Sequence, residues 1–122
     1  TKQMKTTDDQ TIILKGWGHE KWITNNEKYC GKLLFFKKGK KCSWHYHEVK
    51  DEVFYIQSGK VELTFGLTNE KKNSSKLILN QGDSFHVPVG LRHQMLGLED
   101  TELFEFSTQH FEADSIRVEK GD

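Results

Sequence analysis

The chain has 122 residues, enough for one domain with a single core and too few for two. Its 18 Lys and Arg residues balance 18 Asp and Glu residues, which argues against a nucleic-acid groove or an anionic membrane surface as partner. The sequence shows no signal peptide and no apolar run of membrane-spanning length, and it has only two cysteines. We therefore expect a cytoplasmic protein.

The N-terminal part predicts a flexible terminus followed by two strands. Residues 1–10 are polar without periodicity, and the domain is expected to occupy residues 11–122. Strands are predicted over 11–14 and 29–37, and in the second one Lys32 shares a face with Leu34 and Phe36. An inward-facing Lys32 would be a buried ammonium that needs an anionic partner, whereas an outward-facing one would be a solvated lysine.

Two histidines occupy the next predicted strand, one residue apart. Because successive side chains of a strand point to opposite faces, His45 and His47 present their imidazoles on the same face. Glu52 opens the following strand, 52–57, among apolar neighbours, and a buried carboxylate there needs a partner such as a metal ion. A His-x-His pair by itself, however, lies more often at a surface or in a core than in a metal site.

The second half continues as short strands separated by turns. They are predicted in 61–67, 76–80, 85–90, 93–97 and 101–110, and Pro88 marks a strand end or edge. His86 has the opposite parity to its apolar neighbours and is left out of the site. No segment has the length and apolar stripe of a core helix. This pattern predicts an all-β fold, an antiparallel jelly-roll β-barrel.

The placement of Glu105, of the two cysteines and of the C-terminal tail has more than one interpretation. Alternation alone places Glu105, between two phenylalanines, on the outward face of an edge strand, and a polar cavity is the alternative. Cys30 and Cys42 are interpreted as buried thiols, with a disulfide between neighbouring strands or a redox role of Cys42 as alternatives. The C-terminal tail, 110–122, lacks strong periodicity and could pack across the barrel.

His93, which follows a Pro-x-Gly turn, completes a candidate metal site. Together His45, His47, Glu52 and His93 offer three neutral nitrogen donors and one carboxylate. This donor set suits one divalent transition metal ion, such as Zn, Mn, Fe, Co or Ni, better than calcium or magnesium.

The spacing of these residues resembles the paired sequence motifs of the cupin family. Residues 39–59 follow G-x5-H-x-H-x4-E-x6-G, and residues 82–97 follow G-x5-P-x-G-x2-H-x3-G. Matched position by position, the three histidines and Glu52 fall where that family carries its metal ligands. Gly97 stands where many cupins have an Asn that is not a ligand, so this departure leaves the metal site intact. The alternative is a cupin whose site is empty or adapted to another use.

From Gly16 onward the chain is also similar to the C-terminal cupin domain of type II phosphomannose isomerases. The shared features, beyond the metal motif, are Trp17-Gly18, Lys32, KKG at 37–39, PVGLRH at 88–93, Phe104-Glu105-Phe106 and EADSIRVE at 112–119. Two departures stand out: that family usually has Gln at the position of His45, and the loop between His47 and Glu52 is one residue longer here. A His in place of Gln binds soft transition metals more tightly.

This second resemblance implies a metal-dependent aldose–ketose isomerase that acts on a phosphorylated sugar such as mannose 6-phosphate. It implies that the metal holds the carbonyl and hydroxyl oxygens, that Lys32 or Glu105 moves a proton, and that Arg117 pairs with the phosphate. Each of these three residues also has an ordinary interpretation as a surface charge.

Two other functional classes are open. The same ligands around Fe, Ni or Mn would suit a dioxygenase or a lyase of a small organic acid. A non-catalytic sugar-binding or regulatory module with a structural metal is the other class. In each class the partner is a small molecule. The apolar edge at 13–17, ILKGW, could pair two chains, so a homodimer is expected.

Overall fold

The computed structural model of the protein describes residues 10–122. The flexible terminus predicted for residues 1–10 therefore lies outside the described residues, except for Gln10. The described chain is built of strands and two short 3₁₀ helices: β1 (Thr11–Lys15), β2 (Gly18–Asn25), β3 (Cys30–Phe36), β4 (Trp44–Tyr46), β5 (Glu52–Ser58), β6 (Lys60–Gly66), η1 (Lys71–Asn73), β7 (Ser75–Asn80), β8 (Ser84–Val87), β9 (Arg92–Gly97), β10 (Thr101–Ser107), η2 (Glu112–Asp114) and β11 (Ile116–Glu119).

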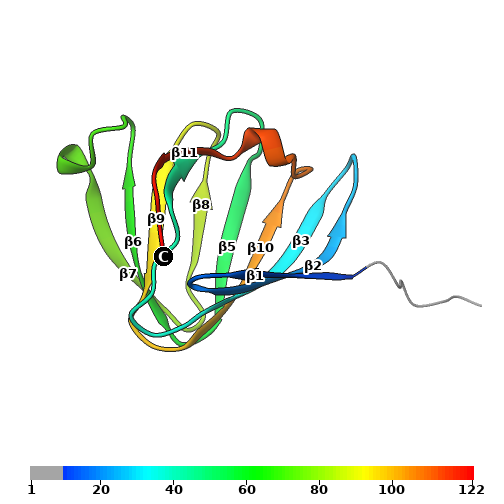
Figure 1. Ribbon diagram of the computed structural model, residues 1–122, viewed down its shortest axis with the longest axis horizontal. Coiled ribbons are helices and arrows are strands. Elements are labelled where there is room, and N and C mark those ends of the chain that lie inside the picture. The colour runs from blue at the N-terminus through cyan, green and yellow to red at the C-terminus, as the bar shows by residue number, and fades with distance from the viewer. Residues whose placement is uncertain (1–9) are drawn as a thin grey trace, which may run out of the picture.

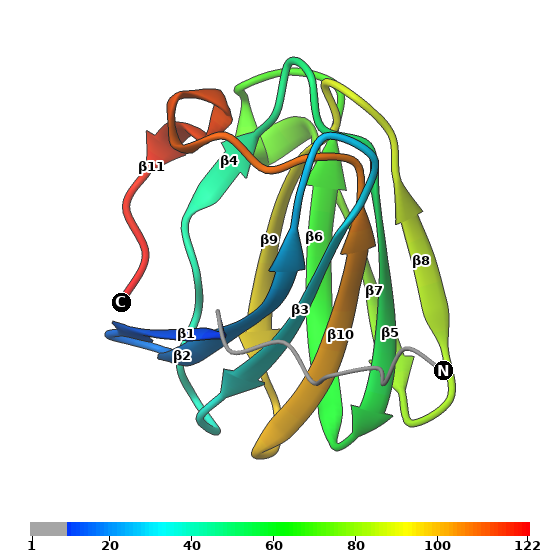
Figure 2. The same cartoon turned by 90° about the vertical axis from the view of Figure 1, so that its right-hand side faces the viewer.

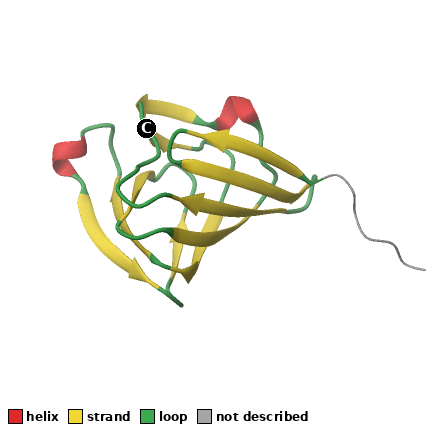
Figure 3. Ribbon diagram, turned by 60° about the horizontal axis from the view of Figure 1, so that its bottom comes forward, coloured by secondary structure: helices red, strands yellow, loops and turns green. Residues whose placement is uncertain are grey.

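The strands form two antiparallel sheets that face each other (Figure 1). One has the order β1-β2-β3-β10-β5-β8 and the other the order β11-β4-β9-β6-β7. Strands dominate the structure, and the two 3₁₀ helices lie in connections between them (Figure 3). The predicted all-β antiparallel jelly roll is thereby confirmed. Within the described residues, no helix is long and apolar enough to cross a membrane.

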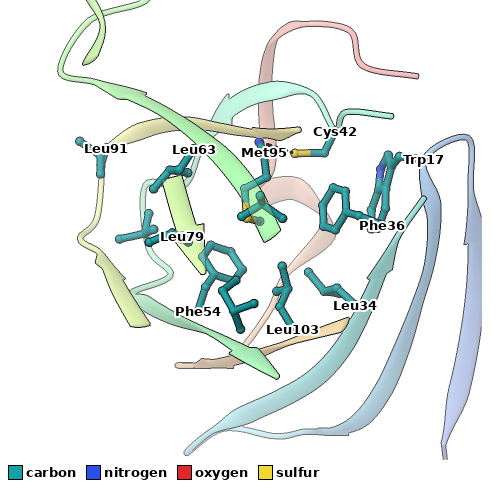
Figure 4. Close-up of a cluster of buried hydrophobic side chains, with 13 residues drawn as sticks. Trp17, Leu34, Phe36, Cys42, Phe54, Leu63, Leu79, Leu91, Met95 and Leu103 are labelled. Atoms are coloured by element: carbon teal, nitrogen blue, oxygen red, sulfur yellow. Dashed lines mark hydrogen bonds between the residues drawn. The ribbon is translucent and has the colours of Figure 1, made fainter. Parts of the chain in front are cut away.

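The apolar core fills the space between the two sheets (Figure 4). Phe54 and Leu103 come from the six-stranded sheet, and Leu63 and Met95 come from the five-stranded one. All four are buried, and burying a side chain of this size contributes roughly 1.5–3 kcal/mol. The core therefore holds the two sheets in a fixed relation, and with them the side chains at the polar end of the barrel.

The inward face of the six-stranded sheet changes from apolar to charged along the strands. In β3, Leu34 is followed toward the N-terminal end of the strand by Lys32, which is buried with 2% of its surface exposed. In β10, Leu103 pairs with Leu34, and Glu105 pairs with Lys32. Glu52 belongs to the same end of the neighbouring β5. Buried charges from three adjacent strands thus lie together at one end of the core.

The outward placement expected for Glu105 is wrong, because the residue is only 4% exposed. Its strand, β10, is not an edge strand but lies between β3 and β5. The flanking Phe104 and Phe106 point to the outer face, where their rings stack with centroids 5.9 Å apart and Phe106 is exposed. The apolar residues of this strand therefore mark its outer face, and the carboxylate faces inward.

The C-terminal segment crosses one end of the sheets and adds a strand beside the histidine-bearing β4 (Figure 2). Arg117 of β11 pairs with His45, and Ile116 pairs with Tyr46. Cys30 and Cys42 are both free and buried, as expected for structural thiols. Burial raises the pKa of the Cys42 thiol to about 11, so it stays protonated at neutral pH.

Candidate metal centre

The three histidines of the paired motifs converge on one point. His45 and His47 lie on β4, and His93 lies directly opposite His45 on β9. The ring centroids of His45 and His93 are 4.3 Å apart, and those of His47 and His93 are 5.6 Å apart. One nitrogen from each ring can be chosen so that all lie within 4.8 Å of one another. This spacing fits three ligands of a single metal ion.

Each imidazole is oriented by a hydrogen bond from Nδ1 to a backbone carbonyl. The distances are 2.9 Å for His45, 3.0 Å for His47 and 2.9 Å for His93, and the acceptors are the carbonyls of Ser43, Asp114 and Leu91. A carbonyl can only accept, so each Nδ1 carries the proton and each Nε2 keeps its lone pair. The backbone thereby selects the tautomer that ligates through Nε2.

Burial keeps two of these imidazoles neutral. His93 has no exposed surface, and desolvation lowers its pKa to about 4. Desolvation, reinforced by the neighbouring His93 and His47, holds the pKa of His45 well below its usual range. Neutral imidazole is the form that binds a metal, so the site is prepared for ligation at neutral pH.

Glu52 completes the cluster and provides the test of whether a cation fits. Its Oε2 lies 3.2 Å from His47 Nε2 and 3.4 Å from His93 Nε2. Within the described residues, Glu52 Oε2 and His93 Nε2 are buried and lack a hydrogen-bond partner. Buried lone pairs without a donor are costly, and a cation between them would satisfy both. The four residues therefore fit a divalent metal ion, in the combination that the sequence predicts.

A second charged cluster adjoins the histidines and contains a residue that the sequence analysis missed. Lys50, in the loop between β4 and β5, is only 3% exposed. Its Nζ donates to Glu105 Oε2 at 2.8 Å, and it lies 3.5 Å from Glu52 Oε1. Burial alone would lower the pKa of Lys50, but the carboxylates of Glu105 and Glu52 raise it above its ordinary value. Lys50 therefore stays charged and links the metal site to Glu105.

Lys32 faces inward, which decides between the two alternatives for this residue. Its Nζ lies 3.8 Å from Glu20 Oε1 and 4.0 Å from Glu105 Oε2, and 4.3 Å from the centre of the Trp22 ring. Desolvation would raise the pKa of Glu105, but Lys50 and Lys32 together lower it to about 2. Glu105 is therefore a carboxylate at neutral pH, held between two ammonium groups.

Asp114, in η2, anchors the loop between β4 and β5. Its carboxylate accepts hydrogen bonds from three consecutive backbone N–H groups, at 2.8 Å, 3.0 Å and 2.9 Å, those of Glu48, Val49 and Lys50. Burial would raise its pKa, but these bonds lower it. Since the Asp114 carbonyl also accepts the bond from His47 Nδ1, one residue of the C-terminal segment orients both a candidate ligand and the Lys50 loop. Asp114 belongs to the segment EADSIRVE that carries the resemblance to type II phosphomannose isomerases, but the resemblance assigns it no role.

A cavity of about 90 Å³ joins the two clusters. His45, His47 and Glu52 line it together with Lys32 and Glu105. Ligand pockets for drug-sized molecules usually have volumes of about 300–1,000 Å³, so this interior accepts a small molecule or one end of a larger one.

Two other predicted placements can be compared with the structure. Arg117 also lines the cavity, from the exposed strand β11. His86 is exposed and pairs with Asp51 at 2.7 Å, so its exclusion from the site agrees with its position.

An antiparallel jelly roll with three histidines and a glutamate inside one end defines a class of β proteins with a metal-binding interior. The family model that matches this chain, over residues 32–106, is that of the cupin domain. Because the match covers more than half of the sequence, the chain belongs to the cupin family, as its motifs predict.

Solved structures with the same fold include proteins of different kinds. CapF from Staphylococcus aureus, a capsular polysaccharide assembling protein, is 19% identical, with a TM-score of 0.77 over 90% of this chain and 34% of CapF. A variant of oxalate decarboxylase from Bacillus subtilis is 20% identical, with a TM-score of 0.77 over 93% of this chain and 31% of that one. KdgF from Halomonas sp. is 21% identical, with a TM-score of 0.71 over 86% of this chain and 89% of KdgF.

These similarities concern the fold alone. The present chain spans about a third of the length of the CapF and oxalate decarboxylase chains. One structure of the Bacillus subtilis oxalate decarboxylase is described with Mn(II) centres. No match was found among curated proteins.

Proposed function

We propose that this chain is a metal-dependent enzyme that interconverts the aldose and ketose forms of a phosphorylated sugar, with mannose 6-phosphate as the first substrate to test. The observation that carries the proposal is the meeting of a metal-ligand set and a buried charged cluster in one cavity. The similarity to type II phosphomannose isomerases over most of the sequence supports the reaction type.

His45, His47, Glu52 and His93 would hold the metal. A divalent cation there supplies electrostatic stabilisation of the negative charge that develops on the substrate oxygens. The protein's contribution is to fix the Nε2 atoms through the three Nδ1 hydrogen bonds and to keep water away by burial. The Mn(II) centres of a structurally similar cupin support a divalent metal ion in this fold.

Isomerisation needs a base that moves a proton between two neighbouring carbons. Glu105, one of the two candidates from the sequence, is a weak base, because its pKa is lowered to about 2 and it is bound to Lys50. Glu20 also lines the cavity; its Oε1 accepts a hydrogen bond from Trp22 Nε1 at 2.8 Å and lies 3.8 Å from Lys32 Nζ, so no ammonium is hydrogen-bonded to it. We therefore propose Glu20 as the base, with Glu105 as the counter-ion that keeps Lys50 and Lys32 in place.

The phosphate group would need a cationic partner. Arg117 is predicted for this role from the resemblance, and its position on β11 beside the cavity is compatible with it. A guanidinium can bind a phosphate through two parallel hydrogen bonds. The role of Arg117 stays a prediction that substitution can test.

The test is turnover of mannose 6-phosphate by the full chain loaded in turn with Zn, Mn, Co, Fe and Ni. Proton NMR should show fructose 6-phosphate forming with at least one metal. The His93→Ala variant should lose turnover together with the metal, whereas Glu20→Gln should keep the metal and lose turnover. Absence of turnover with every metal would exclude this isomerase activity.

The size of the cavity favours a second candidate, a lyase or dioxygenase of a small organic acid. An interior of about 90 Å³ surrounds a substrate of a few carbon atoms more completely than a hexose phosphate. Incubation of the Mn and Fe forms with small dicarboxylates, with release of CO₂ and uptake of O₂ as the measurements, distinguishes this activity from isomerisation.

The predicted homodimer and cytoplasmic location stay predictions. β1 is an edge strand of its sheet, and on it Ile12 and Leu14 are 62% and 83% exposed. Light scattering on the Leu14→Lys variant and the parent chain would show whether this edge pairs two copies.

A further inference from the structure

The two buried lysines beside Glu105 use their ammonium hydrogens differently. Lys50 Nζ donates to Glu105 Oε2 at 2.8 Å and lies 3.1 Å from His110 Nδ1. Lys32 Nζ lies 3.8 Å from Glu20 and 4.0 Å from Glu105, distances beyond those of a hydrogen bond. Within the described residues, Lys32 Nζ therefore has charged neighbours but no hydrogen-bond acceptor, although the residue is almost fully buried.

The N–H groups of Lys32 Nζ that make no hydrogen bond to the protein point toward the cavity. The Trp22 ring lies against the ammonium, with its centre 4.3 Å from Nζ, and offers a π face in place of an acceptor. Lys32 itself lines the cavity. Its free N–H groups therefore face the cavity, where an oxygen of a bound molecule would accept them.

The balance of charged side chains around the cavity indicates whether its ligand is an anion or a cation. Its lining has as many cationic as anionic side chains: Lys15, Lys32, Lys50 and Arg117 against Glu20, Glu52, Glu105 and Glu112. With neutral histidines the formal sum is zero, so a divalent metal ion would leave the cavity with two positive charges. In a site of low dielectric constant, such an excess favours an anionic ligand.

We infer that the interior of the cavity is an oxyanion site, in which Lys32 Nζ hydrogen-bonds a carboxylate or phosphate oxygen of the substrate. The inference rests on the metal-dependent part of the proposed function and is independent of isomerisation. It deepens that function by naming the substrate class, small molecules with an acidic oxygen group. It places the main anion contact at the buried Lys32 and leaves the exposed Arg117 with a minor share.

The test measures anion binding by isothermal titration calorimetry on the zinc-loaded full chain, with inorganic phosphate and acetate as probes. At least one of the two should bind, and Lys32→Met should weaken that binding about 10-fold or more, the usual effect of losing a charge-assisted hydrogen bond. The exposed control Lys40→Met should change the affinity by no more than about 3-fold, and Arg117→Met should weaken binding less than Lys32→Met does. Zinc content, measured for every variant, should be unchanged.

A second variant tests the inference even if Lys32→Met does not fold. Glu20→Gln removes a carboxylate that competes for Lys32, so it should tighten anion binding several-fold. Binding of phosphate alone would indicate phosphate esters as substrates, binding of acetate alone would indicate carboxylic acids, and either result supports the site. The inference is overturned if neither probe binds the zinc-loaded parent, or if Arg117→Met abolishes binding and Lys32→Met does not. Anion binding without isomerase turnover would reject only the proposed reaction.

Discussion

Replacing Lys50 by methionine leaves a buried carboxylate without its closest partner. At an effective dielectric constant of 20, a pair of charges 2.8 Å apart interacts by about 6 kcal/mol and a pair 4.0 Å apart by about 4 kcal/mol. Lys32 therefore compensates Glu105 in part. Breaking a buried ion pair costs about 3–5 kcal/mol, and we expect the Lys50→Met cost near the lower limit, about 3 kcal/mol.

Urea unfolding of the metal-free protein, followed by circular dichroism, measures this cost as a fall in the transition midpoint at constant slope. The double variant Lys50→Met/Glu105→Gln should be more stable than Lys50→Met alone, because it removes the unpaired charge as well. The difference between the double variant and the sum of the single variants gives the coupling energy. A Lys50→Met cost below about 1 kcal/mol, with no coupling to Glu105, would refute the account of this pair.

Three further predictions concern the metal site. Asp114→Ala removes the acceptor of three backbone N–H groups, so a competing chelator should show metal affinity reduced about 10-fold or more, with Asp114→Asn intermediate. The metal-free parent should lose stability as the pH falls from 6.5 to about 4, because the unfolded chain takes up protons that the buried His93 and His45 do not; urea midpoints should show this slope, and it should be shallower in His93→Gln, where only His45 still contributes. His45→Gln should fold and keep a weaker metal site, and unchanged affinity for zinc and cobalt would show that His45 is not a ligand.

Alternation predicted the central strands well, because their inward faces are uniform over several residues. Lys32, Leu34 and Phe36 share one face of β3 as expected, the structure shows that this face is buried, and Glu52 lies on the buried face of β5. The histidine cluster was predictable because the motif spacing relates His93 to His45 across more than forty residues of chain. Sequence patterns suffice where a periodicity or a motif extends over the whole feature.

The charged cluster was harder to predict, because it depends on contacts between distant segments. Glu105 was misplaced because the phenylalanines beside it suggest a buried face, while in the structure they lie on the outer side of a central strand. Lys50 and Asp114 lie outside the strands, where alternation carries no information, and the bond between them joins residues 64 positions apart. Only the folded chain shows that these residues meet.

Metal content, determined by mass spectrometry on protein purified without chelator or nickel affinity, tests the central claim most directly. The parent should contain about one equivalent of a transition metal, and both His45→Ala and His93→Ala should lose it. A parent protein that contains no metal, and takes up none on titration with zinc, manganese or cobalt, would contradict the assignment of His45, His47, Glu52 and His93 as ligands.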